Sequence, residues 1–402
     1  MTTRRDLLKG AGVVAGGGLL APSGFRTAIA ASNEPVRVAI VVDTSKVYGF
    51  VGNLYIKGLQ MAFEEVGNEI LGRKVEVVIE DTEANPAVGF AKAKKVLATF
   101  KPHFFLGPIA SSTYAAMKDL VTRSNTIWLT LTQGAGAEDT VLPICSRNTF
   151  SVTWNNWQLS HPFGQWAYKN VAKEFWLGFA NYNWGQGAGA VFKEAFEKAG
   201  GKITGTIAPP LGTADYAPFL SRVVAEKPPA IFCFFAGGDA VNFVKQWHQF
   251  GLHKTTKLTG QGFLVDEAVL PAQGKAALGA TTVLNWARTL DTPENKKFQE
   301  AFTARYKGKL PIAIYPITGY DAGRLIIESV TSAKTTETDK LIPVIEQTAL
   351  KSPRGTIRFD PKTHEAIQPY YIRETRLVGD RVTNVVVDTL AATKTPAKAC
   401  SL

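Results

Sequence analysis

The stretch FLGPIASSTYAAM, residues 105–117, joins an apolar segment to a helix-forming segment through a Gly-Pro turn. Three hydroxyl residues, Ser111, Ser112 and Thr113, stand where the second segment begins. Ser and Thr are favoured at helix starts because their oxygens accept hydrogen bonds from unpaired backbone N–H groups. The same N–H groups and the positive end of the helix dipole attract anions. The stretch predicts a strand, a turn and a helix. Taken alone, it favours capping over an anion site.

The same strand-then-helix order recurs on both sides of this stretch. Before Cys145, strands are predicted at 36–42, 75–79, 103–106 and 126–131, and helices at 54–66, 87–99 and from 112. After it, helices are predicted at 158–170, 188–199, 216–226 and 239–250, and strands at 175–180, 202–208, 230–235 and 257–260. Such alternation is typical of parallel sheets covered by helices. The chain is therefore predicted to be α/β, with two lobes in tandem.

The remaining segments complete this expectation. Asn85 and Pro86 are an N-cap and first-turn pair that opens the helix at 87–99. Helices are expected at about 295–306 and 316–330, and antiparallel strands at 354–359 and 369–373.

The first thirty residues predict export. The stretch TRRDLLK, residues 3–9, is typical of a twin-arginine signal. The apolar stretch at 10–22 is shorter than the roughly 20 residues that span a bilayer. Ala28-Ile29-Ala30 supplies the small residues that signal peptidase requires. We expect cleavage before Ala31 and a periplasmic mature protein.

Charge and cysteine content narrow the function further. The formal net charge is +11, but the basic residues are scattered among acidic ones, which argues against nucleic acid as a partner. Cys233 lies in the apolar run IFCFF and is expected in a buried strand. Cys145 and Cys400 have polar surroundings, and an oxidising compartment would let them form a disulfide.

No motif supports catalysis. GQGAGA, residues 185–190, fits the dinucleotide pattern, but the next strand ends without the acidic residue that holds the ribose. The chain has no nucleophile elbow, P-loop or H-E-x-x-H, and its five histidines show no metal-ligand spacing. We expect neither an enzyme nor a cofactor or metal.

The loops that follow the predicted strands suggest a binding site. Ligands of open α/β sheets bind beyond the carboxyl ends of the strands. These loops combine hydroxyls, glycines, amides and aromatic rings, and the candidate ligand-binding residues are Tyr48, Ser111, Ser112, Thr132, Gly134, Asn156, Trp157, Tyr182, Trp184, Gly237, Asp239 and Phe263. Such a set suits a small molecule with one anionic end and one flat apolar end.

Further motifs occur in a fixed order along the chain. NEILGRKVEV at 68–77 is followed by GPxxSS at 107–112, WGxG at 184–187, LGTxDY at 211–216, GYDA at 319–322, GxxRFD at 355–360 and QPY at 368–370. This order resembles that of periplasmic solute-binding proteins of the leucine/isoleucine/valine-binding type, which feed ABC importers. The resemblance covers essentially the whole mature chain. It implies two Rossmann-like lobes and a three-crossing hinge, with closure around the solute.

The resemblance also implies domain limits and residue roles. After a signal peptide at 1–30, lobe 1 is expected to comprise 34–150 and 286–355, lobe 2 to comprise 151–285 and 356–392, and a tail to follow at 393–402. Ser111 or Ser112, with Thr132 and Gly134, are implied to hold a ligand carboxylate, and Trp184 to line the pocket. The turn that contains Ser111, Ser112 and Thr113 is then expected both to cap a helix and to bind an anion.

The ligand class follows from one departure from the family pattern. Amino-acid binders of this family carry a glutamate shortly after the position of Gly260, where it neutralises the ligand ammonium. Here Gln261, Gly262 and Phe263 follow, and burial of an unpaired ammonium is unfavourable. The aromatic residues Trp157 and Phe263 fit the ligands of the family subgroup that takes up benzoate- or cinnamate-like acids, which this chain resembles.

We therefore expect a monomeric solute-binding subunit of an ABC importer, which captures an aromatic carboxylate and docks on an inner-membrane permease. The alternatives are a binder of branched-chain or other amino acids or amides, a ligand-sensing receptor module and, with least support, an exported enzyme.

Overall fold

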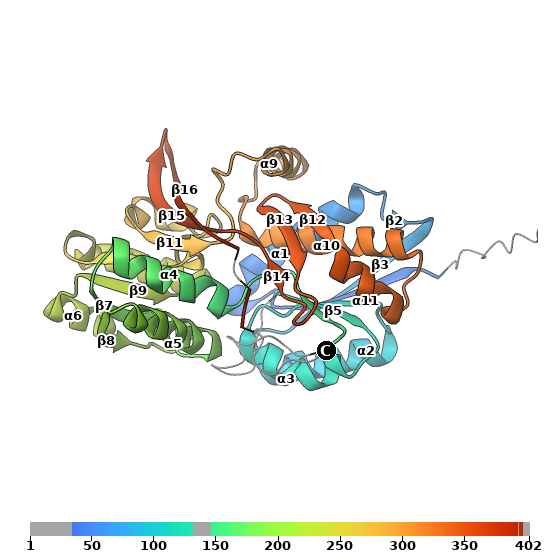
Figure 1. Ribbon diagram of the computed structural model, residues 1–402, viewed down its shortest axis with the longest axis horizontal. Coiled ribbons are helices and arrows are strands. Elements are labelled where there is room, and N and C mark those ends of the chain that lie inside the picture. The colour runs from blue at the N-terminus through green and yellow to red at the C-terminus, as the bar shows by residue number, and fades with distance from the viewer. Residues whose placement is uncertain (1–33, 132–145, 393, 397–402) are drawn as a thin grey trace, which may run out of the picture. The chain divides into compact units, whose positions relative to one another are not determined.

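The computed structural model describes residues 34–131, 146–392 and 394–396. These residues form two α/β lobes, each built on its own sheet (Figure 1). Within these ranges no helix has both the length and the apolar character needed to cross a bilayer. The predicted signal peptide and the two cysteines of the predicted disulfide, Cys145 and Cys400, lie outside the described residues.

The first lobe contains a six-stranded sheet in the order β2-β3-β1-β4-β5-β6. Its strands are β1 (Val36–Val42), β2 (Glu69–Ile70), β3 (Arg73–Asp81), β4 (Phe104–Leu106), β5 (Ile127–Thr130) and β6 (Thr149–Ser151). All neighbours are parallel except β2 and β3. β1 is apolar at almost every position because helices cover both faces of the sheet.

Side chains of β1 alternate between two helical layers. Val38 and Ile40 pack on one face, and Ala39 and Val41 on the other, as the two-residue period of a strand requires. The first face carries α1 (Gly49–Glu64) and α10 (Ile314–Ala333), and the second carries α2 (Pro86–Thr99) and α3 (Ser111–Thr122). The lobe also contains α9 (Pro293–Arg305), α11 (Thr338–Gln347) and a small antiparallel sheet of β12 (Ala349–Ser352), β13 (Gly355–Phe359) and β14 (Ala366–Ile367).

The second lobe contains a seven-stranded sheet in the order β16-β15-β11-β10-β9-β7-β8. Its strands are β7 (Glu174–Phe179), β8 (Lys202–Ile207), β9 (Ala230–Phe234), β10 (Lys257–Gln261), β11 (Thr281–Leu284), β15 (Tyr370–Val378) and β16 (Arg381–Leu390). β7 to β11 pair in parallel, whereas β15 runs antiparallel to both β11 and β16.

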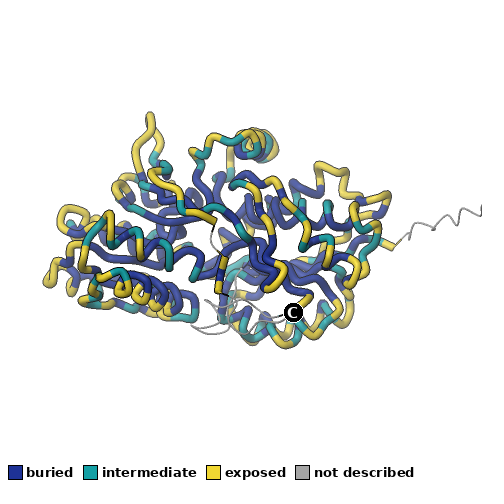
Figure 2. The backbone as a smooth tube through the Cα atoms, viewed as in Figure 1, coloured by how far each residue is buried: buried dark blue, intermediate teal, exposed yellow. Residues whose placement is uncertain are grey.

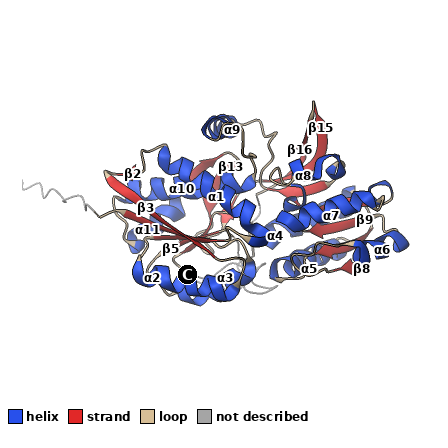
Figure 3. Cartoon of the chain, turned by 180° about the vertical axis from the view of Figure 1, so that it is seen from behind, coloured by secondary structure: helices blue, strands red, loops and turns tan. Residues whose placement is uncertain are grey.

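Helices cover both faces of this second sheet (Figure 3). One face carries α4 (Asn156–Asn170) and α5 (Asn183–Lys198), and the other carries α6 (Ala217–Glu226), α7 (Gly237–Gln249) and α8 (Leu270–Gln273). Short 3-10 turns are η1 (Lys46–Tyr48), η2 (Leu252–Lys254), η3 (Gly262–Val265) and η4 (Gly274–Ala277). Figure 2 shows the strands of both sheets as largely buried, while the outer helices and the tip of the β15–β16 hairpin are exposed.

Three segments connect the two sheets, as the family resemblance implied. They are 152–155 between β6 and α4, 285–292 between β11 and α9, and 368–369 between β14 and β15. Gln368 joins all three segments, because Asn285 Nδ2 donates to its Oε1 at 2.8 Å and its own Nε2 donates to Thr153 O.

Arg354 reinforces this junction from the first lobe. Its guanidinium donates to Gln368 Oε1, to Val152 O and, at 2.7 Å, to Asp321 Oδ2. Both charged side chains are fully buried. Burial raises the pKa of the Asp321 carboxyl, and Arg354 opposes that shift. The hinge is therefore fastened by a buried ion pair and an amide.

Two local predictions are confirmed. Asn85 caps α2, with its Oδ1 accepting from Ala87 N at 2.9 Å and from Val88 N at 3.2 Å, and Pro86 follows in the first turn. Cys233 lies in the buried strand β9, and burial raises the pKa of its thiol well above the usual value. It is a core thiol.

The predicted antiparallel strands at 354–359 and 369–373 are confirmed, but they belong to different sheets, because β13 pairs with β12 and β14 while β15 pairs with β11 and β16. Two other features differ from the predictions. α5 begins at Asn183 rather than at 188, so Trp184 is helical. The helix α11 was not predicted. The β12–β13 hairpin spans the expected lobe limit between residues 355 and 356, and the lobe limits stay a prediction.

Candidate functional site

An aromatic cavity lies where the loops of the two lobes meet. Its lining residues are Tyr48, Ile109, Leu131, Trp154, Tyr182, Trp184, Phe234, Ala236, Phe263 and Tyr315. The cavity measures about 30 Å³, whereas a cavity of roughly 150 Å³ holds benzene. A ring-sized ligand can enter only if the surrounding side chains or lobes separate.

The rings of this inner cavity contact one another at angles that avoid face-to-face stacking. Phe263 lies at the centre, with its ring centroid 5.2 Å from that of Trp154 and 5.9 Å from that of Phe234. Trp184 and Tyr182 approach Phe234 at 6.3 Å and 6.1 Å. Tilted and edge-on contacts at these distances are favourable between aromatic quadrupoles. The walls therefore offer ring faces and edges to a flat ligand.

A hydrogen bond between two phenols crosses the inner cavity. Tyr48, from the first lobe, and Tyr182, from the second, have hydroxyl oxygens 2.7 Å apart. Burial is the main cause of a raised pKa for both phenols. Both therefore stay neutral at physiological pH, and the pair holds the two lobes together at this point.

A buried polar network fixes Trp184 from behind. Its indole Nε1–H donates to Gln261 Oε1 at 2.9 Å. Gln261 Nε2 in turn donates to Asn156 Oδ1 at 2.7 Å and to Ser160 Oγ at 2.8 Å. Asn156 Nδ2 donates to the backbone oxygen of Trp184 at 3.0 Å. Because the indole N–H already has a partner, Trp184 offers the cavity only its ring.

The start of α3 differs from the prediction. The N-cap position is held by Ala110, and no side chain caps the helix, so the expected capping by Ser111 and its neighbours is wrong. Asp43, directly after β1, binds the turn before the helix, because its Oδ2 accepts from Ile109 N at 2.8 Å and Ala110 N at 3.0 Å. The hydroxyl of Ser111 is buried and makes no hydrogen bond to another described residue.

The structure brings together only some of the predicted residues. Tyr48, Tyr182, Trp184 and Phe263 line the inner cavity, and Asn156 supports it through the network behind Trp184. Ser111 and Ser112 open the helix that follows the lining residue Ile109. Thr132 and Gly134 lie outside the described residues.

Other predicted residues lie away from the inner cavity. Trp157 is half-buried and stacks on His161 with ring centroids 4.6 Å apart. Gly237 opens α7 with φ of 57°, and a Cβ there would lie 2.6 Å from Val47 O. Asp239, in the same turn, accepts from Gly212 N at 3.0 Å. These residues organise loops around the cavity without lining it.

Several lining residues were missed as ligand contacts. In the sequence, Phe234 has the pattern of an ordinary strand residue and Trp154 that of a connecting loop. Tyr315 lies at the start of α10, which follows the connection at 285–292. Only the position of Phe234 at the carboxyl end of β9 carries a signal in the sequence.

The titration of Asp239 follows from its burial. Its side chain is buried, and desolvation raises the pKa of the carboxyl to about 6 against the opposing effect of the Gly212 N–H. An aspartate in an unfolded chain has a pKa of about 3.9. The folded protein therefore holds this proton more tightly. The resulting stabilisation is complete below the unfolded pKa and is lost as the pH rises through about 6.

We expect Asp239→Asn to remove this pH dependence, since asparagine keeps an acceptor for Gly212 N–H. Between pH 4 and pH 7 the free energy of unfolding of the wild type should fall relative to the variant by about 2 kcal/mol. Urea unfolding at pH 4, 5.5 and 7 measures the difference. The comparison of the two proteins cancels the titration of Asp266, whose pKa burial raises to about 7. Parallel profiles would show that Asp239 titrates normally.

The glycine run at 185–189 does not form a phosphate-binding loop. Gly185 and Gly189 lie within α5, where a Cβ would meet Ala180 O at 2.0 Å and the Phe179 ring at 2.8 Å. These glycines let the helix pack closely on β7. In the described ranges no group of three or more His, Cys, Asp or Glu side chains gathers in metal-binding geometry.

The match to a known family covers most of the chain. Residues 35–380 match the family described as periplasmic binding protein. The chain belongs to the periplasmic binding protein family. Leu/Ile/Val-binding protein homolog 6 of Brucella melitensis is 26% identical over 88% of this chain and 90% of its own length.

Two solved structures share the fold of this periplasmic binding protein. One is a solute binding protein of an ABC transporter from Rhodopseudomonas palustris BisB5 in complex with 3,4-dihydroxybenzoic acid, with 28% identity, a TM-score of 0.84 and coverage of 90% of this chain and 99% of that one. The other is an R. palustris solute binding protein in complex with benzoate, with 25% identity, a TM-score of 0.82 and coverage of 91% and 99%. This periplasmic binding protein is accordingly of the ABC-transporter type, a class of solute-binding proteins rather than enzymes.

Proposed function

We propose that this protein is the periplasmic solute-binding subunit of an ABC importer and that it captures a small aromatic carboxylate by closure of its lobes. It would act as a monomer and deliver the ligand to a permease in the inner membrane. The twin-arginine signal and cleavage before Ala31 belong to the same proposal.

The composition of the inner cavity is the observation that carries this proposal. Aromatic rings form most of its wall, and none of the described residues that line it is acidic or basic. An α-amino acid would bury its ammonium there without a charged partner, which is unfavourable. An aromatic acid has no such group, and its ring can pack on Trp184, Phe234 and Phe263.

The start of α3 supports a place for the carboxylate. Ile109 lines the inner cavity, and Ser111 and Ser112 follow within two and three residues. The first N–H groups of a helix have no partner within the helix, and the Ser111 hydroxyl makes no hydrogen bond in the described structure. Asp43 already accepts from Ile109 N and Ala110 N, so the carboxylate would bind the N–H groups beyond Ala110.

Lobe movement follows from the size of the inner cavity. At about 30 Å³ it has no room for a benzoate ring. The Tyr48–Tyr182 hydrogen bond joins the two lobes beside it. Entry of the ligand would separate these phenols. Closure of the lobes would then bring the aromatic lining residues into contact with the ring of the ligand.

Calorimetry on ligand-stripped protein tests the ligand class. We expect 4-hydroxybenzoate and 3,4-dihydroxybenzoate to bind at micromolar concentration, the matching amides at least tenfold more weakly, and leucine not at all. Trp184→Ala should weaken binding of the acids by tenfold or more, since it removes one wall of the ring site. Trp157→Ala is the matched control, because that indole stacks on His161 away from the inner cavity, and it should change affinity by less than twofold.

Tight binding of leucine, with no response to the benzoates, would contradict the proposed ligand class and favour the amino-acid alternative suggested by the name of the Brucella relative. Equal losses in Trp184→Ala and Trp157→Ala would place the ligand elsewhere.

A further inference from the structure

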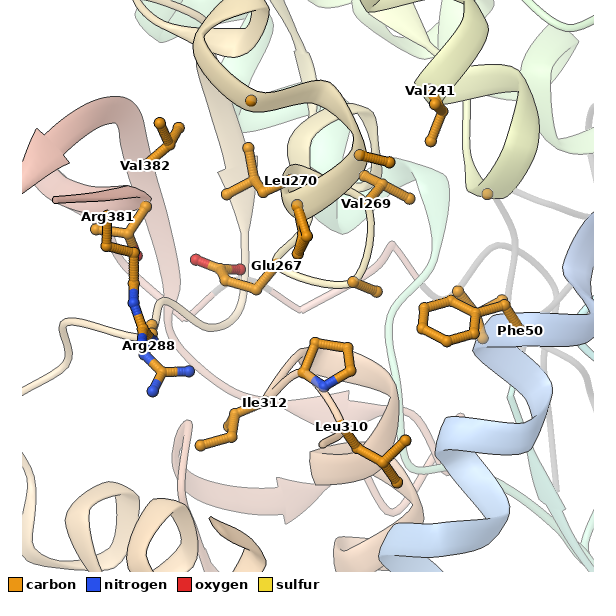
Figure 4. Close-up of a pocket in the computed structure, with 18 of the residues that line it drawn as sticks. Phe50, Val241, Glu267, Val269, Leu270, Arg288, Leu310, Ile312, Arg381 and Val382 are labelled. Atoms are coloured by element: carbon orange, nitrogen blue, oxygen red, sulfur yellow. The ribbon is translucent and has the colours of Figure 1, made fainter. Parts of the chain in front are cut away.

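A large groove lies beside the inner cavity and is distinct from it. It measures about 1010 Å³ and receives side chains from both lobes, among them Phe50, Leu310 and Ile312 of the first and Leu270, Arg288 and Arg381 of the segments around the second (Figure 4). We call it the outer groove. It has about the volume of a site for a drug-sized molecule.

A wall of backbone separates the outer groove from the inner cavity. Val47 and Gly237 line the outer groove, and their sequence neighbours Tyr48 and Ala236 line the inner cavity. Val47 O and Gly237 approach so closely that a Cβ on Gly237 would lie 2.6 Å from this oxygen. Two ligands could therefore occupy the two spaces at the same time.

The outer groove has an apolar surface. The partly exposed side chains of Val241, Leu310 and Val382 form part of it, and the ring of Phe50, which is 54% exposed, stands at one side. A large exposed aromatic ring beside contiguous aliphatic side chains is typical of a binding surface rather than of a solvated one. This surface suits an aliphatic chain.

Basic residues outnumber acidic residues among those that line the outer groove. The lining residues include the cations Lys46, Arg288, Lys309 and Arg381 and the anions Glu267 and Asp380. Glu267 is already compensated, because Asn384 Nδ2 donates to its Oε1 at 3.0 Å and Arg373 lies 3.9 Å from its Oε2. The remaining charge of the outer groove is positive.

Arg288 is the most informative of these cations. It is half-buried, and burial together with the nearby Arg381 lowers the pKa of its guanidinium. Among the described residues, neither arginine makes a side-chain hydrogen bond or an ion pair within 4.0 Å. The Glu267 carboxylate offsets part of the charge of Arg288 without forming an ion pair within 4.0 Å. The two neighbouring guanidiniums still provide the donors that a carboxylate prefers.

We propose that the outer groove is a second ligand site, which takes an organic anion with an aliphatic chain. Arg288 and Arg381 bind the anionic head, and Leu310, Val382 and Phe50 receive the chain. The site does not depend on the proposed aromatic ligand, because its residues lie on the other side of the Val47–Gly237 wall.

Binding of decanoate tests the second site. We expect decanoate to bind with one site per protein in calorimetry, and acetate and decyltrimethylammonium, which lack the chain or reverse the charge, at least tenfold more weakly. The variant Arg288→Gln/Arg381→Gln should lower decanoate affinity by tenfold or more. Arg376→Gln is the matched control, because this exposed arginine lies on the same hairpin but pairs with Glu374.

The Trp184→Ala variant separates the two sites. Decanoate should bind this variant as tightly as the wild type, whether or not the inner cavity takes an aromatic acid. Loss of decanoate binding in Trp184→Ala would assign decanoate to the inner cavity and overturn the second site. Equal binding of decanoate and decyltrimethylammonium, unchanged affinity in the double arginine variant, or no binding below millimolar concentration would overturn it as well.

Discussion

Replacement of Arg354 by methionine is expected to lower the free energy of unfolding by about 3–5 kcal/mol, because loss of one partner leaves a buried charge uncompensated. The stranded group is Asp321, whose Oδ2 accepts from Arg354 Nε at 2.7 Å with both side chains fully buried. The same substitution removes the hydrogen bonds to Val152 O and Gln368 Oε1, and so loosens two of the three hinge segments. Equilibrium unfolding in urea measures the loss.

Arg358→Met is the matched control for this prediction. Arg358 lies on the same strand, β13, and is exposed, so its replacement should change the free energy of unfolding by no more than about 0.5 kcal/mol. The double variant Arg354→Met/Asp321→Leu should recover much of the loss, since an apolar pair can replace a buried ion pair at little cost. A loss in Arg354→Met no larger than in the control would show that the buried pair does not hold the hinge.

Replacement of Gln261 by leucine is expected to weaken the binding of an aromatic acid by tenfold or more and to lower the free energy of unfolding by about 3 kcal/mol. Leucine fills a similar volume but leaves the Trp184 indole N–H, the Asn156 amide oxygen and the Ser160 hydroxyl without their partner. Each buried polar group left unpaired costs about 1–3 kcal/mol. Trp184, no longer held by its N–H, can then leave the orientation that forms the cavity wall. Calorimetry and urea unfolding give the two values.

A double-mutant cycle separates the positioning of Trp184 from a general loss of packing. In a Trp184→Phe background the indole N–H is absent, so Gln261→Leu should reduce stability by about 1 kcal/mol less than in the wild type. Gln186→Leu is the matched control, because this exposed amide of α5 bonds only Asn181 among the described side chains. Additive losses in the cycle would show that Gln261 does not act through Trp184.

Local order along the chain was predictable from the sequence. Strands buried on both faces are continuous apolar runs, and such runs at 36–42 and 230–235 are visible in the sequence without tertiary knowledge. The cap at Asn85 was also predictable, because its side chain binds backbone N–H groups within the first turn of α2. The α/β class, the two lobes and the family follow from the order of such elements and motifs.

Capping at α3 was not predictable in this way. Ser111 has a hydroxyl suited to capping and lies at the helix start. The turn before the helix is nevertheless held by Asp43, which accepts from Ile109 N and Ala110 N, 66 and 67 residues further along the chain. The pairing of β13 with β12 rather than with β15 is a similar case. Each depends on which strand lies beside which, and the periodicity of a single segment carries no information about its neighbours.

The sequence by itself therefore determined the two lobes, most of their helices and strands, and the aromatic character of the loops at the cleft. Only the tertiary structure decided which rings meet, because Tyr315 and Phe234 reach the inner cavity from elements far apart in the chain. It also decided that Trp157 lies away from the cavity while Trp184 lines it. The reason is physical: a cavity is made by side chains that converge from different elements, and convergence depends on packing between elements rather than on the residues of any one of them.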